Sequence, residues 1–349
     1  MNLLIDLCHP TEFFFSYRII KELQARGHRI IITARKEKVL RDLLKNSEFE
    51  YYFTSKKANS LIKLLLELLT RTWRIFKIAF SSKVDLFFGM SILSSSVAGF
   101  LLRKPTLLFT EQESMGIKTK LVFKLASKVY TPIFFDKALG RKHKKLNGLL
   151  QLTYLHPRYF SPKKTIVEDL LSINLEEERY FIVRFCDWKA SHDINQKGFS
   201  IKTKMQIIND LSKAGRVYVL DEENGELFQS YRLDIPKHLI HHVLAFSSFS
   251  VVETTSVAIE SALLGVPVVR CTTLASTKKG GAAIFRELEK IGLVFSYSDE
   301  KNAYQKIGEF LSNQQNKDYW LAKRDGFIRD FDKNLVLTLT DEIEQSLKK

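Results

Sequence analysis

Short apolar runs alternate with segments of helical periodicity along the whole of this chain. An apolar run bounded by turn residues predicts a buried strand, and apolar positions three and four apart predict an amphipathic helix. The predicted strands span 3–7, 29–33, 49–53, 84–89 and 105–109, and then 180–185, 216–220, 250–252 and 266–270. The predicted helices span 13–26, 60–80, 91–102 and 201–214, a helix or loop holds 236–245, and only helices follow from about 303. This alternation predicts an α/β fold in which helices cover both faces of parallel sheets.

Two Xaa-Pro steps interrupt the alternation near the middle of the chain. They are His156-Pro157 and Ser161-Pro162. The residue before a proline is disfavoured in a helix, so such steps are typical of a linker, and the strand–helix pattern restarts after them. We therefore expect two doubly wound, Rossmann-like domains over 1–155 and 156–325, followed by a C-terminal helix over 326–349.

The predicted helix over 60–80 carries many leucines and aromatic residues, including Trp73. Its charged residues are Lys63, Glu67, Arg71, Arg74 and Lys77. Charges at this density exclude a stable membrane span, which needs about 20 consecutive apolar residues. An amphipathic helix of this kind either lies on an anionic bilayer or packs against a sheet, and the periodicity is the same in both cases.

The composition is that of a globular protein. Hydrophobic residues make up 45% of the 349 and charged residues 27%, which excludes the disordered and fibrous classes. The three cysteines, Cys8, Cys186 and Cys271, lie far apart without metal-ligand spacing, so we expect neither a disulfide framework nor a metal site. The N-terminus also lacks the pattern of a signal peptide. These features favour the cytoplasm, and the helix over 60–80 leaves open peripheral contact with the inner face of the plasma membrane.

The formal net charge of +15 at neutral pH indicates an anionic partner. Nucleic acid, an acidic membrane surface and phosphorylated substrates all meet that description. The basic residues are spread along the chain, without an arginine-rich arm, zinc-finger spacing or a helix-turn-helix pattern. We therefore expect no nucleic-acid partner, and the acidic membrane and phosphorylated substrates stay as candidates.

The most informative segment, 254–269, joins a hydroxyl-rich turn to a short predicted helix, a Gly/Pro connection and an apolar strand. Thr254, Thr255 and Ser256 start the helix, where backbone N–H groups and the helix dipole favour a phosphate. Glu260, one turn later, is placed to accept hydrogen bonds from ribose hydroxyls. The same residues are ordinary choices for a helix cap and first turn, so the segment fits either a nucleotide-binding corner or a plain helix start.

Loops after the predicted strands carry further candidates, because ligands of open α/β sheets gather beyond the carboxyl ends of the strands. His9 leaves the first predicted strand and either takes a proton from an acceptor hydroxyl or caps the following helix. Glu111 follows the strand over 105–109, and it either orients or deprotonates a substrate hydroxyl or belongs to a solvated loop.

Two later loops are rich in functional side chains. The loop over 184–200 contains Arg184, His192 and Asp193, which suit a catalytic base or a nucleotide contact. In the loop over 272–281, Lys278 lies shortly before a Gly pair, and its positive charge would balance that of a phosphate. A surface turn has the same composition. The sequence has no Walker-type loop, no Gly-x-Gly-x-x-Gly after the first strand and no nucleophile elbow. These absences argue against a kinase and against an ordinary nicotinamide dehydrogenase.

Several motifs resemble those of one family. They are Asp6-Leu7-Cys8-His9-Pro10, Arg26-Gly27-His28, Ile32-Thr33-Ala34-Arg35, Arg184-Phe185 through Trp188, Ser191-His192-Asp193, Gly198-Phe199-Ser200, and Glu260 with Ala262-Leu263-Leu264-Gly265-Val266-Pro267. Over close to its full length the sequence resembles the domain-of-unknown-function family DUF354, which is itself similar to the GT-B superfamily. The resemblance implies two facing Rossmann-like domains, with the acceptor on the N-terminal domain, the nucleotide sugar mainly on the C-terminal one, and a final helix that crosses back.

The resemblance also implies roles for single residues. Glu260 would bind the donor ribose, the turn at 254–256 its diphosphate, and His9 would occupy the place of a catalytic base. Arg184 and Lys278 join the donor site in this interpretation, and Glu111, His192 and Asp193 join the catalytic candidates.

We therefore expect a metal-independent glycosyltransferase, without a cofactor, that moves a sugar from a UDP-linked or other nucleotide donor to a surface-polysaccharide or lipid-linked acceptor. One alternative is a non-hydrolysing sugar-nucleotide 2-epimerase, which needs no acceptor. The other is a catalytically inert GT-B-like protein that binds a sugar nucleotide.

Overall fold

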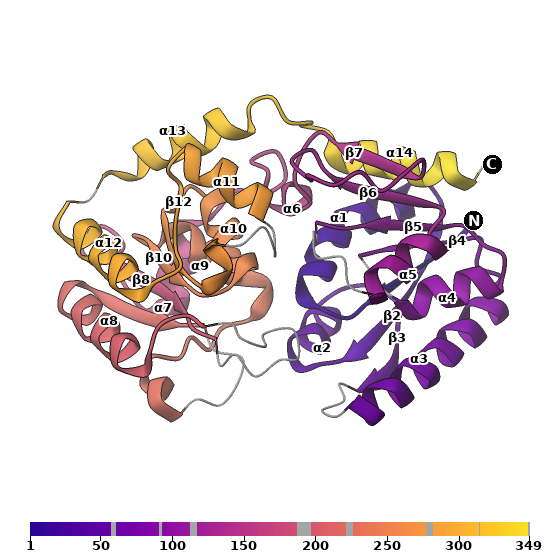
Figure 1. The fold of residues 1–349 in the computed structure, drawn as a ribbon, viewed down its shortest axis with the longest axis horizontal. Coiled ribbons are helices and arrows are strands. Elements are labelled where there is room, and N and C mark those ends of the chain that lie inside the picture. Colours follow the sequence, from indigo (N-terminus) through magenta and orange to yellow (C-terminus); the bar gives the residue numbers. More distant parts are fainter. Residues whose placement is uncertain are drawn as a thin grey trace. The chain divides into compact units, whose positions relative to one another are not determined.

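The computed structural model describes residues 1–56, 61–90, 93–111, 117–186, 197–220, 226–276, 282–313 and 315–347. The chain divides into two compact units. Unit 1 comprises Met1–Tyr159 and Phe331–Lys349, and unit 2 comprises Phe160–Asp330. Each unit is built on one sheet with helices around it (Figure 1).

Unit 1 contains a seven-stranded sheet with the order β3-β2-β1-β4-β5-β6-β7, in which all neighbours are parallel. Its strands are β1 (Asn2–Leu7), β2 (Arg29–Lys36), β3 (Tyr51–Lys56), β4 (Leu86–Gly89), β5 (Thr106–Phe109), β6 (Lys128–Pro132) and β7 (His143–Leu146). The order reverses between β1 and β4, as in a doubly wound Rossmann sheet.

Helices cover both faces of this sheet. They are α1 (Pro10–Ala25), α2 (Lys38–Lys45), α3 (Leu61–Ser81), α4 (Leu93–Leu101), α5 (Ile117–Leu125), α6 (Leu152–Leu155) and α14 (Leu335–Leu347). Leu108 of β5 packs with Val122 of α5, whereas the next residue, Phe109, contacts Phe15 of α1 with ring centroids 5.3 Å apart. Because successive strand residues point to opposite faces, α5 and α1 lie on opposite sides.

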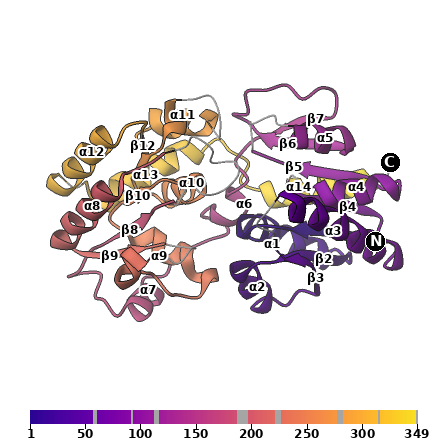
Figure 2. The same ribbon diagram turned by 60° about the horizontal axis from the view of Figure 1, so that its bottom comes forward.

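The C-terminal helix α14 packs within unit 1, beside α1 (Figure 2). Glu342 of α14 accepts a hydrogen bond from the Tyr130 hydroxyl at 2.8 Å and pairs with Lys144. Glu344 lies 2.8 Å from Nε2 of His28. The contacts of this helix therefore reach α1, the turn before β2, and the strands β6 and β7.

Unit 2 contains a five-stranded parallel sheet with the order β12-β11-β10-β8-β9. Its strands are β8 (Tyr180–Arg184), β9 (Arg216–Val219), β10 (Ser250–Val252), β11 (Val268–Cys271) and β12 (Val294–Tyr297). Its helices are α7 (Lys164–Leu171), α8 (Ile201–Ala214), α9 (Ile240–Phe246), α10 (Thr255–Leu263), α11 (Ala282–Lys290), α12 (Glu300–Ser312) and α13 (Lys317–Ile328), with short 3-10 turns at Glu226–Tyr231, Lys237–Leu239 and Thr273–Ser276.

The predicted α/β class with parallel sheets is confirmed, and α8 and β10 have the predicted bounds. The strands β6, β7 and β12 were not predicted. The reason is clearest for β7, an edge strand whose sequence His143-Lys144-Lys145-Leu146 has no apolar run. Charged residues on an edge strand discourage pairing with another chain, so such a strand is invisible to a search for hydrophobic runs.

Candidate functional site

In unit 2 the strand order reverses between β8 and β10, which are direct neighbours. Ligands of open α/β sheets bind beyond the carboxyl ends of the strands at such a point. The chain leaves β8 at Phe185 and β10 at Glu253, and the N–H of Glu253 donates to the carbonyl of Arg184 at 2.9 Å. The hydroxyl-rich turn that begins at Thr254 therefore starts at this position of the sheet.

The side chain of Glu253 joins the loops at this edge. It is 2% exposed, and its carboxylate accepts the backbone N–H of Cys186 at 2.5 Å and that of Phe199 at 2.6 Å. Nζ of Lys204 lies 3.0 Å from the same carboxylate. Burial raises the pKa of Glu253, and Lys204 with the two N–H donors opposes that shift. The residue fixes both ends of the β8–α8 loop, a role that sequence analysis missed.

Two residues near Glu253, Gly198 and Lys204, allow the loop to pack against its carboxylate. A Cβ atom at Gly198 would lie 2.1 Å from Oε1 of Glu253, so the close approach needs glycine. Lys204, on the first turn of α8, also donates to the carbonyl of Cys186 at 3.0 Å. The sequence contained a signal for this arrangement, a glutamate placed directly between an apolar strand and the hydroxyl-rich turn.

The start of α10 has an unused hydrogen-bonding group among the described residues. Thr254 is the N-cap residue with an extended backbone, yet its side chain makes no capping hydrogen bond. Its Oγ1 is buried and has no hydrogen-bond partner among the described residues. A buried hydroxyl without a partner destabilises a protein by about 1–3 kcal/mol, so such a group in a native site calls for an explanation such as a bound ligand. The N–H groups of the first turn and the helix dipole favour an anion at the same place.

Two basic side chains of α13 hold the other end of α10. Nζ of Lys317 donates to the carbonyl of Gly265 at 2.8 Å, and Arg324 donates to that of Leu263 at 3.1 Å. Burial, together with the neighbouring positive charge of Arg324, lowers the pKa of Lys317 to about 7. These two side chains therefore fix the carboxyl end of α10, whereas its amino end is positioned by the edge of the sheet.

Glu260 lies in the second turn of α10 and is buried. Its Oε1 is 3.4 Å from Nε2 of His241, a buried residue of α9 whose ring also contacts Phe160 edge-on. His241 was not singled out in the sequence, because a histidine on a helix face carries no signal until its neighbour across the fold is known. The pair places a carboxylate and an imidazole side by side, one turn beyond the N-terminus of α10.

The two later loops hold two donor candidates, Arg184 and Lys278, and two catalytic candidates, His192 and Asp193. Arg184 ends β8, and its guanidinium donates to the carbonyl of Leu220 after β9 at 2.5 Å. Arg184 therefore lies at the same sheet edge as Thr254, with its side chain turned toward β9. Lys278, His192 and Asp193 lie outside the described residues.

In unit 1, His9 is exposed directly after β1 and caps α1. Its Nδ1 accepts the N–H of Thr11 at 3.3 Å, and the Glu12 carboxylate accepts the N–H groups of Cys8 and His9 at 2.5 and 3.2 Å. This reciprocal arrangement is a capping box. Burial raises the pKa of Glu12 to about 8, although the two N–H donors act against it. The capping interpretation of His9 is confirmed, and Nε2 of its ring is not part of the cap.

Below this loop lies a buried ion pair that the sequence did not predict. Arg71 of α3 reaches Asp6 of β1, with Nη2 2.5 Å from Oδ1, and both side chains are at most 2% exposed. Thr33 donates to the same Oδ1 at 2.8 Å, and Arg71 also reaches the carbonyl of Leu7. The pair therefore fixes the carboxyl end of β1, from which His9 departs.

Glu111 follows β5 and is half-buried. Its carboxylate accepts a hydrogen bond from Nε2 of Gln151 at 2.8 Å. The structure therefore gathers Thr254, Thr255, Ser256, Glu260 and Arg184 around one sheet edge of unit 2, and places His9 and Glu111 at strand ends of unit 1.

The described residues lack two features. They contain no group of three His, Cys, Asp or Glu side chains able to hold a metal ion. Within the same ranges, no helix combines the length and the apolar character needed to cross a membrane.

Two Rossmann-like units with polar loops at the carboxyl edges of parallel sheets form the architecture of the GT-B class, and solved structures of that class match nearly the whole chain. UDP-GlcNAc 2-epimerase from Neisseria meningitidis, bound to UDP-GlcNAc, is 14% identical with a TM-score of 0.72, covering 99% of this chain and 100% of its own. MurG from Acinetobacter baumannii is also 14% identical, with a TM-score of 0.56 and the same coverage. A glycosyltransferase from Streptomyces sp. SF2575, complexed with thymidine diphosphate, is 12% identical with a TM-score of 0.57, covering 98% of this chain and 99% of its own. The protein therefore has the GT-B fold.

Within that class the family is defined by sequence. Residues 1–279 match the family described as "Protein of unknown function (DUF354)", and the chain belongs to it. Comparison with curated proteins gives no significant match.

Proposed function

We propose that the protein is a metal-independent glycosyltransferase that takes its sugar from a nucleotide donor, UDP-linked in our assignment. The observation that carries the proposal is the free start of α10 at the switch point of the unit 2 sheet. There Thr254 offers a buried hydroxyl that has no partner among the described residues, beside the N–H groups of the first helical turn. A diphosphate supplies both the missing hydrogen bond and the negative charge that this position favours.

In this proposal the turn at Thr254, Thr255 and Ser256 holds the diphosphate, and Glu260 accepts hydrogen bonds from the ribose. Arg184 and Lys278 supply positive charge nearby. The buried Glu253 acts indirectly, since it shapes the loop beside the donor.

The reaction is a direct displacement. A base removes the proton of an acceptor hydroxyl, whose oxygen then forms a bond to the anomeric carbon of the donor sugar. The bond from that carbon to the diphosphate oxygen breaks, and the electron pair leaves with the nucleoside diphosphate, stabilised at the start of α10. His9 and Glu111 are our candidates for the base, and His192 and Asp193 complete the catalytic assignment.

The acceptor we propose is a growing surface polysaccharide or a lipid-linked sugar. Such an acceptor is met at the cytoplasmic face of the plasma membrane, so the protein would work there as a peripheral protein. The net charge of +15 supports this location, because that membrane face is negatively charged.

Incubation of the full chain with labelled UDP-GlcNAc and other nucleotide sugars, with and without a polysaccharide and lipid extract, tests the proposal. Label transferred to the extract, with release of the nucleoside diphosphate, is the expected result. A 2-epimer formed without any extract would identify an isomerase instead, and binding without turnover in every mixture would identify an inert sugar-nucleotide-binding protein. Each of these outcomes overturns sugar transfer.

The base can be assigned with His9→Asn, because asparagine caps a helix as well as histidine does and has no imidazole. We expect transfer to fall by about 10²–10⁴-fold, as for loss of a general base, with an unchanged melting temperature. If His9→Asn keeps full activity and Glu111→Gln loses it, Glu111 is the base.

A further inference from the structure

The outer face of α3 carries an apolar stripe in place of the polar residues expected on a helix at the surface. The stripe consists of Leu65, Leu66, Leu69, Trp73, Phe76 and Phe80. Trp73 is 57% exposed and Phe80 70% exposed, and the three leucines are exposed to a similar degree. Spacings of three and four residues along 66, 69, 73, 76 and 80 place these side chains on one side of the helix.

Of the stripe, only the half-buried Phe76 also packs against the core that holds α3 to its own sheet. The main contacts come from another side of the helix, where Ile75 and Ala79 are buried against Leu4 of β1 and Phe87 of β4. Arg71, on the same inner side, forms the buried pair with Asp6. The fold therefore already stabilises α3 without any contribution from the exposed side chains of the stripe.

The aromatic rings of the stripe form an ordered surface. Trp73 and Phe76 stack with centroids 5.7 Å apart and planes 5° apart, and Phe76 and Phe80 stack at 6.3 Å and 9°. Nζ of Lys77 lies 5.0 Å from the centre of the Trp73 ring. A tryptophan next to lysines is typical of side chains that insert at a membrane–water interface.

The neighbouring helices extend the apolar surface. α4 lies between α3 and α5 in one layer of unit 1 (Figure 1). Phe100, near the end of α4, is 62% exposed, and Leu101 beside it is also exposed. Leu121 of α5 is exposed as well. The layer α3–α4–α5 thus presents large apolar side chains from each of its three helices.

The charge of this layer is predominantly positive. Residues 61–128 contain eleven Lys and Arg but only four Asp and Glu. Of the acids, Glu67 is buried against Arg35, and Asp85 lies 3.7 Å from Lys104. The exposed charges around the stripe, among them Lys63, Arg74 and Lys77 on α3 itself, are therefore cationic.

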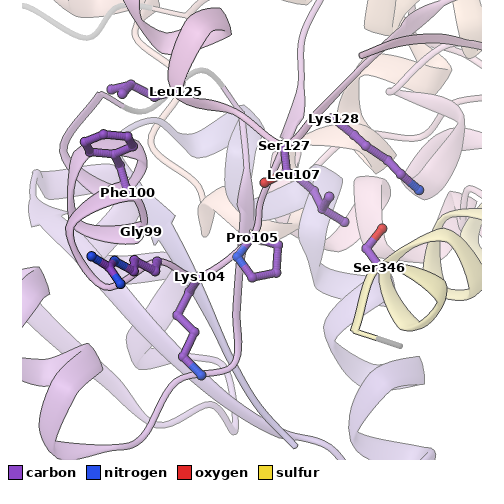
Figure 3. Close-up of a pocket in the computed structure, with 10 residues that line it drawn as sticks. Gly99, Phe100, Lys104, Pro105, Leu107, Leu125, Ser127, Lys128 and Ser346 are labelled. Carbon is purple, nitrogen blue, oxygen red and sulfur yellow. The ribbon is translucent and has the colours of Figure 1, made fainter. Parts of the chain in front are cut away.

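A hollow of about 560 Å³ lies at one end of the layer, where β5 and β6 begin (Figure 3). Phe100, Arg103, Lys104 and Lys128 line it, and Lys104 and Lys128 extend on opposite sides of Pro105 in the figure. Lys128 lies 3.7 Å from Glu342, whereas the described residues contain no ion pair for Arg103. An exposed phenylalanine beside three cations suits the glycerol and phosphate of a lipid headgroup.

We propose that the layer α3–α4–α5 docks on an anionic phospholipid bilayer, with the stripe inserted at the acyl boundary and a lipid phosphate in the Arg103–Lys104–Lys128 hollow. A second copy of the chain fits this surface less well, because a two-fold contact would bring one cationic face against another. This docking surface would account for the membrane location proposed above, and docking does not require that the protein transfers sugar.

Co-sedimentation of the full chain with vesicles tests the docking surface without any nucleotide. We expect binding to vesicles of phosphatidylcholine with an equal part of phosphatidylglycerol, and little binding to phosphatidylcholine alone. Raising the salt from about 0.1 M to about 0.5 M should weaken the binding. Absence of binding to the anionic vesicles at low salt would overturn the proposal, whether or not the protein transfers sugar.

Two surface variants locate the contact. Trp73→Ser/Phe80→Ser should lower the partition coefficient by about tenfold or more, because both rings leave water on docking. Ile201→Ser/Met205→Ser is the matched control, since it removes two exposed apolar side chains from α8 of unit 2. Equal losses for both double variants would contradict the proposed surface. A dimer in sedimentation velocity that the α3 variant dissolves would also contradict it, by showing that a second copy covers the stripe.

Replacement of the hollow's cations tests the headgroup contact. Arg103→Gln/Lys104→Gln should weaken binding to the anionic vesicles and reduce its salt dependence. Inorganic phosphate should compete no better than chloride at the same ionic strength if the ligand is a lipid at the bilayer surface. Displacement by phosphate alone would show that the hollow binds the free ion, and would overturn its assignment to lipid.

Discussion

The carboxylate of Glu253 accepts the backbone N–H of Phe199 at 2.6 Å, across 54 positions of sequence. The same carboxylate accepts the N–H of Cys186, so one buried side chain closes both ends of the loop between β8 and α8. The residue that follows it, Thr254, starts the helix to which we assign the donor diphosphate. The geometry of the proposed site therefore depends on a group that itself need not touch the ligand.

Gly198→Ala should disturb this arrangement directly. The added Cβ would lie 2.1 Å from Oε1 of Glu253, and Glu253 is held by two backbone donors and cannot easily move. We expect a loss of roughly 1–3 kcal/mol in the free energy of unfolding, measured by urea denaturation. Gly308→Ala in α12 is the control, because it has open space and a helical backbone and should be neutral or slightly stabilising. Equal stability of the two variants would refute the close contact.

Lys204→Met should leave the carboxylate of Glu253 buried with its N–H donors alone. Removing one partner of a buried pair typically costs about 3–5 kcal/mol, so we expect a loss near the lower end, since the N–H donors stay. The pKa of Glu253, already raised by burial, should rise further, and the loss of stability should therefore be smaller in acid, where the carboxyl group is protonated. The double variant Lys204→Met/Glu253→Gln should lose less than the sum of the two single variants, and additivity would argue against the pair.

Glu12→Gln should change the pH dependence of stability. Because the pKa of Glu12 is raised to about 8 in the folded protein, the folded chain keeps a proton that the unfolded chain loses at lower pH. The wild-type stability should therefore fall from about pH 5 to about pH 8, by at most about 1.4 kcal/mol per pH unit from this group. Glutamine keeps the cap and does not ionise, so the variant should gain stability relative to wild type over that window. Glu48→Gln, at an exposed carboxylate beside Lys21, should show no such gain.

Glu260→Gln should separate nucleotide binding from folding better than truncation does. Glu260 is buried, and its carboxylate lies 3.4 Å from the imidazole of His241. Alanine would therefore leave a cavity and also remove the polar neighbour of His241. Glutamine keeps the volume and one acceptor oxygen. We expect UDP affinity to fall by about tenfold, as for loss of a charge-assisted hydrogen bond, with little change in melting temperature. Unchanged affinity by calorimetry would remove Glu260 from the site.

The sequence predicted those parts of the fold and site that local patterns encode. Apolar runs gave the central strands, for example β1 and β10, because strands buried on both faces are continuously hydrophobic. The start of α10 was visible because three hydroxyl residues precede an apolar helix. The edge strand β7 was missed because its exposed lysines hide it.

Residues whose roles arise only from long-range contacts could not be predicted. Glu253 acts on backbone groups 54 and 67 positions away, and Arg71 acts on Asp6, 65 positions away. His241 becomes part of the site only because α9 lies against α10. No local period or motif carries such information, so the buried polar network around both sheet edges had to come from the structure.

Calorimetric titration of UDP into the Thr254→Val variant tests the central claim most directly. Valine has the shape of threonine without its hydroxyl, and Oγ1 of Thr254 has no protein partner to lose within the described structure. The free energy of unfolding should therefore stay the same or rise, while UDP affinity should fall by about tenfold, because the diphosphate loses a hydrogen bond. A folded variant that binds UDP as tightly as the wild type would contradict the assignment of the donor site to the start of α10.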